Sequence, residues 1–163
     1  MRWLAFFILA YVALGLNAGL ARAIQFKSAT PDFVLLAAVF IAISAPHDTA
    51  LLACFILGAL HDLAGEGTLG LLAFSYGIAA IFLIAAHQAV NRKNPAAQFI
   101  LTAIAGFLIA IIITLHAWLR TSGHPPLSPL FTSAIYSAIL APFLLPIMQR
   151  MNRVFRFQRS SRG

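Results

Sequence analysis

The sequence carries very little charge, and acidic side chains are almost absent from it. Of its 163 residues only four are Asp or Glu and eleven are Lys or Arg, so charged residues make up 9% of the chain. Soluble domains carry about 25% charged residues. Hydrophobic residues reach 61% and the mean hydropathy is +0.92. The composition therefore predicts a polytopic membrane protein with too little polar sequence for a separate soluble domain.

The sequence also lacks the parts from which most active sites are built. Cys54 is the single cysteine, which excludes a disulfide framework and disfavours a cysteine-based metal site. The histidines have no metal-ligand spacing, no serine stands in a nucleophile-elbow context, and no Gly-rich loop has phosphate-binding spacing. We expect no pair of buried carboxylates either. We therefore predict a chain that is not an enzyme, without metal or cofactor, in which Cys54 is a small packing residue.

Six apolar runs, separated by polar or Pro-rich stretches, predict an all-α bundle of about six transmembrane helices. The second and third are short: about fifteen residues at 1.5 Å each span roughly 22 Å, against a hydrocarbon core of about 30 Å. They form either a hairpin that does not cross fully or short spans in a locally thinned bilayer. The first run also resembles a signal peptide, but its length favours a helix. The runs cover 3–21, 32–45, 49–63, 69–87, 96–119 and 130–148, so we divide the chain into a bundle, 1–149, and a basic tail, 150–163.

Prolines and acidic residues predict where several helices begin or bend. Pro31 suits the first position of the second helix, and Asp32 suits the positive end of its dipole. Pro46 ends that run, and we expect Asp48 to be the N-cap of the third helix. Pro142, with a second proline one turn later, predicts a kink in the sixth run.

Basic residues are distributed unevenly between the two ends of the predicted bundle. Loops on the cytoplasmic side of a membrane protein carry an excess of Lys and Arg. Six crossings put both termini at the end that is richer in these residues, so we predict cytoplasmic termini. The richer end holds eight basic residues, Arg2, Arg92, Lys93 and five arginines of the tail, and the other end holds three, Arg22, Lys27 and Arg120.

The tail has an arginine at every third position. Arg150, Arg153 and Arg156 begin this series and are interleaved with aliphatic and aromatic residues. Such a segment suits an arm that lies on anionic lipid or contacts a cytoplasmic partner. The alternative is a plain topology signal. We expect no nucleic-acid binding, because the chain has no folded domain to present the charge.

One acidic residue, Asp62, stands at the end of an apolar run. Gly58 and Asp62 are four residues apart, so they share a helix face that a neighbouring helix can approach closely. A charge at this depth costs roughly 2.5–3.5 kcal/mol on insertion scales, so a partner is expected. Candidate cations are Arg22, Lys27 and Arg120. Three roles remain open for Asp62: a structural cap or interhelical hydrogen bond, a partner-docking group, and a proton relay or transport group.

The chain resembles the MreD family, the rod shape-determining membrane proteins of bacteria. The resemblance runs through Pro31-Asp32, the stretch VLLAAVFIAISAPH that ends after Pro46, Gly58 with Asp62-Leu63, and Leu69-Gly70. Pro142 in the last helix, followed by an apolar stretch and a basic tail, also agrees. His61 departs from the pattern, because an apolar residue is expected there, and it leaves open whether Asp62 has an unusual local partner.

The resemblance implies a non-enzymatic scaffold subunit of the cell-wall elongation complex in the bacterial inner membrane. It implies MreC as the partner, together with MreB, a RodA-type polymerase and a class B penicillin-binding protein. A homo-oligomer is a further possibility. The family is also similar in architecture to the substrate-binding component of energy-coupling-factor transporters. The alternative function is therefore a solute-binding transporter subunit, with Asp62 and His61 in its binding site.

Overall fold

All regular secondary structure in the described part of the chain is helical. The computed structural model describes residues 3–24, 30–65, 70–87, 95–120 and 128–155. Two of its helices, α6 and α7, contain segments long and apolar enough to cross a membrane, 96–120 and 130–150. The remaining predicted spans are shorter, so crossing by all six stays a prediction. The helices are α1 (Trp3–Ala18), α2 (Leu20–Ala23), α3 (Phe33–Ser44), α4 (His47–Ala64), α5 (Leu71–His87), α6 (Pro95–Arg120) and α7 (Ser128–Phe155).

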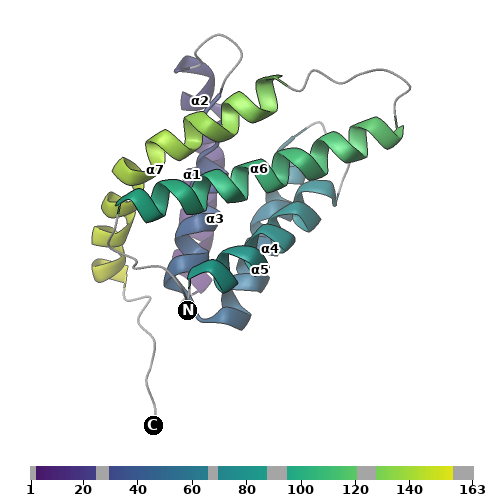
Figure 1. Cartoon of the computed structure of the whole chain (residues 1–163). Helices are drawn as coiled ribbons and strands as arrows, with labels where there is room; N and C mark the ends of the chain where they lie inside the picture. Colours follow the sequence, from purple (N-terminus) through teal and green to yellow (C-terminus); the bar gives the residue numbers. More distant parts are fainter. Residues whose placement is uncertain (1–2, 25–29, 66–69, 88–94, 121–127, 156–163) are drawn as a thin grey trace.

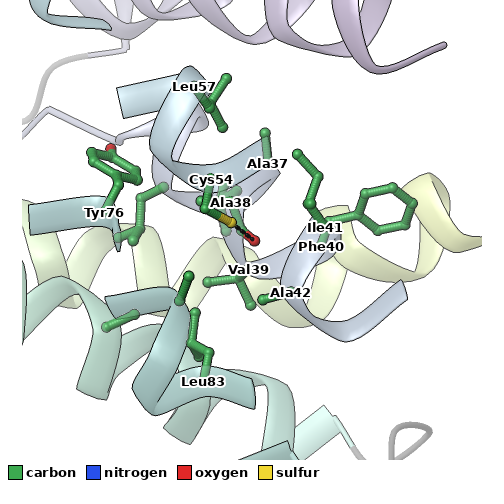
Figure 2. Packing of buried hydrophobic residues seen from close by; sticks show 14 of the residues in the cluster. Ala37, Ala38, Val39, Phe40, Ile41, Ala42, Cys54, Leu57, Tyr76 and Leu83 are labelled. Atoms are coloured by element: carbon green, nitrogen blue, oxygen red, sulfur yellow. Dashed lines mark hydrogen bonds between the residues drawn. The ribbon is translucent and has the colours of Figure 1, made fainter. Parts of the chain in front are cut away.

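Helix α3 lies at the centre of the bundle. Every residue from Phe33 to Ile43 is buried, and the helix contacts α1, α4, α5, α6 and α7. Figure 1 shows α6 and α7 in front of α3 and α1 behind it. A helix that is apolar on all sides can be surrounded in this way. Small residues bring α4 close, since the Cys54 thiol donates to the Ala38 carbonyl oxygen with an Sγ–O distance of 3.5 Å (Figure 2).

The starts of α3 and α4 differ from the predictions. Asp32 is the N-cap of α3, and its carboxylate accepts from the backbone amides of Val34 and Leu35. Pro31 therefore precedes the cap and is not the first helical residue. The N-cap of α4 is Pro46, so the prediction of Asp48 was wrong by two residues. Because the carbonyl of Pro46 already accepts from Ala50 N at 2.8 Å, the helix starts earlier, and Asp48 lies in its first turn, where the helix dipole still favours a carboxylate.

Helix α7 is longer than its apolar run. It continues to Phe155, so residues 149–155 extend the helix beyond the predicted end at residue 148. Pro142 and Pro146 lie inside it, where each removes a helical hydrogen bond. Figure 1 shows that α7 changes direction before its yellow C-terminal part, as the prolines predicted.

Large apolar side chains cover the outside of the bundle. Exposed examples occur on α1, α4, α5, α6 and α7, among them Leu63, Phe74 and Phe143, which are 71%, 60% and 72% exposed. A soluble monomer rarely exposes apolar patches beyond a few hundred Å². Apolar surface on every outer helix is what a bundle in contact with lipid requires.

Candidate functional site: a polar cluster at one end of the bundle

Asp62 caps the helix that follows it. The side chain lies in the last turn of α4 and is 3% exposed. One carboxylate oxygen, Oδ2, accepts from the backbone amides of Gly70 and Ala73 at 2.9 and 3.0 Å, and the other, Oδ1, accepts from Leu72 N at 3.1 Å. The first amides of a helix have no partner within it. Asp62 therefore satisfies the start of α5 from a neighbouring helix, with a charge that the α5 dipole favours.

These contacts identify hydrogen-bond donors to the Asp62 carboxylate. Among the described residues, the donors to Asp62 are three backbone amides of the turn into α5. Arg120 is exposed at the end of α6, whereas Lys27 and the side chain of Arg22 lie outside the described residues. Of the roles left open by the sequence, the observed hydrogen bonds are those of a structural interhelical cap.

Gly58 allows α4 and α5 to touch. A Cβ on Gly58 would lie 2.7 Å from the Leu72 carbonyl oxygen and 2.8 Å from the Ala73 Cα. Both are backbone atoms, so any side chain would push α5 away. Gly70 supports the same junction, because its φ of +93° favours glycine. Gly58, Asp62 and Gly70 thus form one unit, the α4–α5 junction.

The His61 side chain contacts side chains of other helices, whereas Asp62 contacts backbone amides. Its Nε2 lies 3.1 Å from Asn17 Nδ2 on α1, and its Nδ1 lies 3.5 Å from the hydroxyl of Tyr76 on α5. The Tyr76 hydroxyl donates to Asp32 Oδ2 at 3.0 Å. These four side chains come from α1, α4, α5 and the cap of α3, and we call them the polar cluster. The apolar residue expected at position 61 is replaced by one that ties three other elements together.

The direction of each hydrogen bond in the polar cluster follows from the Asn17 amide at one end of the series and the Asp32 carboxylate at the other. Phe33 N donates to Asn17 Oδ1, so the Asn17 amide nitrogen faces His61 and must donate. His61 Nε2 is then the acceptor, and Nδ1 carries the proton that the Tyr76 oxygen accepts. Tyr76 in turn donates to the Asp32 carboxylate. With this assignment the hydrogen bonds run from Asn17 through His61 and Tyr76 to the Asp32 carboxylate.

Helix α7 joins the polar cluster through two serines. Ser137 Oγ accepts from Asp32 N at 2.8 Å, and Ser133 Oγ donates to the carbonyl oxygen of Thr30. Residues 30–32 precede α3 and are not helical, so their backbone groups need such partners. The end of the bundle where α1 and α4 finish and α3, α5 and α7 begin is therefore held by side-chain hydrogen bonds.

A cavity of about 240 Å³ opens beside the polar cluster. Three of the cluster residues border it, and α6 contributes apolar residues to its lining. The fully buried Pro31 also borders it. Its described lining comprises Asn17, Thr30, Pro31, Asp32, Leu35, His61, Leu72, Gly106, Ile109, Ala110, Ile113, Leu130, Ser133, Ala134 and Ser137.

The other predicted site residues lie away from this end. Pro46 is exposed where α4 starts, Pro142 lies in the second half of α7, and Arg150 is exposed near the end of that helix. Arg156 and the side chain of Arg153 fall outside the described residues. The structure thus brings together Gly58, Asp62 and Gly70, with Pro31 nearby, and separates them from the rest.

The polar cluster itself was missed from the sequence. The sequence singled out His61 only as the neighbour of Asp62 and Asp32 only as a charge at a helix start, and it did not connect them with Asn17 or Tyr76. Alternation of six helices does place all four at the same end, and this was the available signal. Among the described residues, no three His, Cys, Asp or Glu side chains lie together as a metal site would require. The cluster's groups are instead engaged with one another and with backbone amides, so the arrangement positions helices.

Comparison with known proteins gives one match. The family model described as rod shape-determining protein MreD matches residues 1–155. No curated protein and no solved structure matches the chain significantly.

Proposed function

The chain belongs to the family of the rod shape-determining protein MreD, and we propose that it is an integral membrane scaffold of the bacterial cell-wall elongation complex. Its family is that of a structural component in cell-shape determination. In the proposed role it docks MreC and the wall synthases in the inner membrane and supports peptidoglycan synthesis without catalysing it. The family match lends no support to the alternative of a solute-binding transporter component.

The proposed topology has six crossings and cytoplasmic termini. The uneven distribution of Lys and Arg supports it. So does the polar cluster, since alternating helices bring the ends of α1 and α4 and the starts of α3, α5 and α7 to one side. In this topology the α4–α5 junction and the polar cluster lie at the periplasmic end, and residues 150–163 form a cytoplasmic tail. Arg150, Arg153 and Arg156 would contact anionic lipid or the MreB filament there.

We assign docking to the outer face of α4 and α5. Helix α3 is buried from Phe33 to Ile43, so it offers no surface to a partner. The single observation that carries the assignment is the α4–α5 junction, in which Asp62 and Gly58 fix two helices that both expose large apolar side chains. On this face lie Leu52, Phe55, Leu63, Phe74, Ile81 and Phe82. Gly58 and Asp62 would act indirectly, by setting the spacing of that face for the MreC helix or for a second copy of the chain.

The test is a gentle-detergent pull-down of the tagged chain from its own cells. We expect a bitopic periplasmic coiled-coil protein and the wall synthases among the bound proteins. Phe74→Ala on the docking face is expected to reduce their recovery about tenfold, because truncating an anchoring aromatic side chain costs more than 1 kcal/mol. Phe143→Ala is the matched control, since Phe143 is also an exposed phenylalanine but lies on α7.

Equal recovery with the two variants would refute docking on α4 and α5. Recovery of a pair of ATPases with a coupling membrane subunit, and of no shape-determining protein, would overturn the scaffold role itself.

A further inference from the structure

The cavity beside the polar cluster has the chemistry of a ligand site, and we propose that it binds a primary ammonium group. The proposal rests on the cavity alone and not on the docking role. The ammonium group can come from the ethanolamine head of a membrane lipid or from a small free amine. Both present a cation with N–H donors, and the experiment below separates them.

The lining excludes an anion. The first amides of α3 are engaged: Asp32 N with Ser137, Phe33 N with Asn17, and those of Val34 and Leu35 with the Asp32 carboxylate. No backbone donor is therefore left at this helix start for a phosphate or carboxylate. Asp32 also brings a negative charge to the cavity wall, which would repel one.

The unused capacity of the lining consists mainly of acceptors. Asp32 Oδ2 accepts from Tyr76, and Ser137 Oγ accepts from Asp32 N, so each keeps a lone pair. Ser133 Oγ donates to Thr30 and keeps its own lone pairs. None of the described lining residues is Lys or Arg. An ammonium group supplies the N–H donors that these oxygens can accept, and it supplies a positive charge to pair with Asp32, which no described lining residue provides.

The volume of the cavity and its apolar lining residues limit the size and polarity of the part of the ligand next to the ammonium group. Its 240 Å³ is the room of about eight waters at about 30 Å³ each. That is below the roughly 300–1,000 Å³ of a site for drug-sized molecules. The part of the lining that α6 supplies includes the apolar residues Ile109, Ala110 and Ile113. A primary ammonium group attached to a short apolar chain fits this lining, with the ammonium group at the polar residues and the chain at the apolar residues of α6.

The experiment is native mass spectrometry of the full chain in detergent, with lipids of identical acyl chains that carry ethanolamine, choline or glycerol heads. Choline is the critical comparison, because its quaternary ammonium has the charge but no N–H donor. We expect the ethanolamine lipid to be retained at least tenfold over the other two. A separate arm adds free ethanolamine to lipid-depleted protein. Thermal stabilisation there, with no preference among the lipids, would support the same site with a free amine as its ligand.

Three variants locate the binding. Asp32→Asn keeps a side chain that caps helices well but removes the charge, and is expected to lower the preference about tenfold or more. Ala110→Leu fills the cavity and leaves the polar cluster intact, and is expected to abolish binding. Asp48→Asn, an exposed carboxylate on α4, is the control and leaves binding unchanged. Equal retention of choline lipid together with no stabilisation by free ethanolamine, preference for the glycerol head, no binding of any probe, or binding that survives both Asp32→Asn and Ala110→Leu would overturn the proposal.

Discussion

Replacing Asp62 with Asn tests whether the α4–α5 junction depends on a carboxylate. The two oxygens of Asp62 together accept from three amides, Gly70 N and Ala73 N on one oxygen and Leu72 N on the other. Asn keeps a single acceptor oxygen, and its NH₂ group would face an N–H in place of the second. At least one hydrogen bond to a charged group is lost, which costs about 1.5–3 kcal/mol. Asp62→Ala leaves all three amides without this acceptor and is expected to cost more, about 3 kcal/mol or above, at about 1–3 kcal/mol for each unsatisfied donor.

The single cysteine provides the assay. Cys54 is fully buried between α4 and α3, so a maleimide reacts with it only when the bundle opens. At 1.4 kcal/mol per factor of ten, the loss in Asp62→Asn predicts labelling roughly ten- to a hundredfold faster in mild mixed micelles. Asp48→Asn is the control: Asp48 is exposed in the first turn of α4, and its loss costs about 0.3–1 kcal/mol. Labelling of Asp62→Asn no faster than that of Asp48→Asn would refute the capping role.

Three further substitutions test other contacts by the same labelling rate. Gly58→Ala is expected to cost about 1–3 kcal/mol, because its Cβ would lie 2.7 Å from the backbone oxygen of Leu72. Gly77→Ala is the control and is expected to be neutral, because its Cβ would lie 3.6 Å from a side-chain carbon of Phe55. Equal effects of the two substitutions would contradict the close approach of α4 and α5. Gly70→Ala is expected to cost about 1–2 kcal/mol, since φ is +93°, and an unchanged rate would contradict that backbone conformation. Ser137→Ala leaves Asp32 N without an acceptor and costs about 1–2 kcal/mol. Ser75→Ala, equally buried, removes a bond within its own helix to Leu71 O and serves as its control.

Asp62 shows how far the sequence leads toward the site. The residue stands out because a carboxylate in an apolar run requires a partner, and its spacing from Gly58 indicates a close helix contact. The partner itself was sought among cationic side chains, because only side chains are visible in a sequence. A structural cap was among the roles that the sequence left open for Asp62. Backbone amides at the start of the next helix become donors only once the turn is formed, so the three donors were identified only in the structure.

The central position of α3 in the bundle could not be predicted from the sequence either. In a soluble protein, polar residues mark the outer face of a helix, and their absence would identify a buried one. Here the exposed helices are apolar as well, because they face lipid. The apolar run at 32–45 therefore predicted the helix but not its burial, and the polar cluster could not be assembled until the neighbours of α3 were known.

The shortness of α3 explains why the polar side chains gather at one end. Its twelve residues reach about 18 Å, and since protein surrounds the helix it does not need to match the bilayer thickness. The chain leading into it, residues 30–32, then lies among other helices with non-helical backbone groups. Such backbone is tolerated at membrane depth only where protein satisfies it. Ser133, Ser137 and Asn17 do so from α7 and α1. The cavity lies at the same helix start, and Asn17, Ser133 and Ser137 border it together with Asp32.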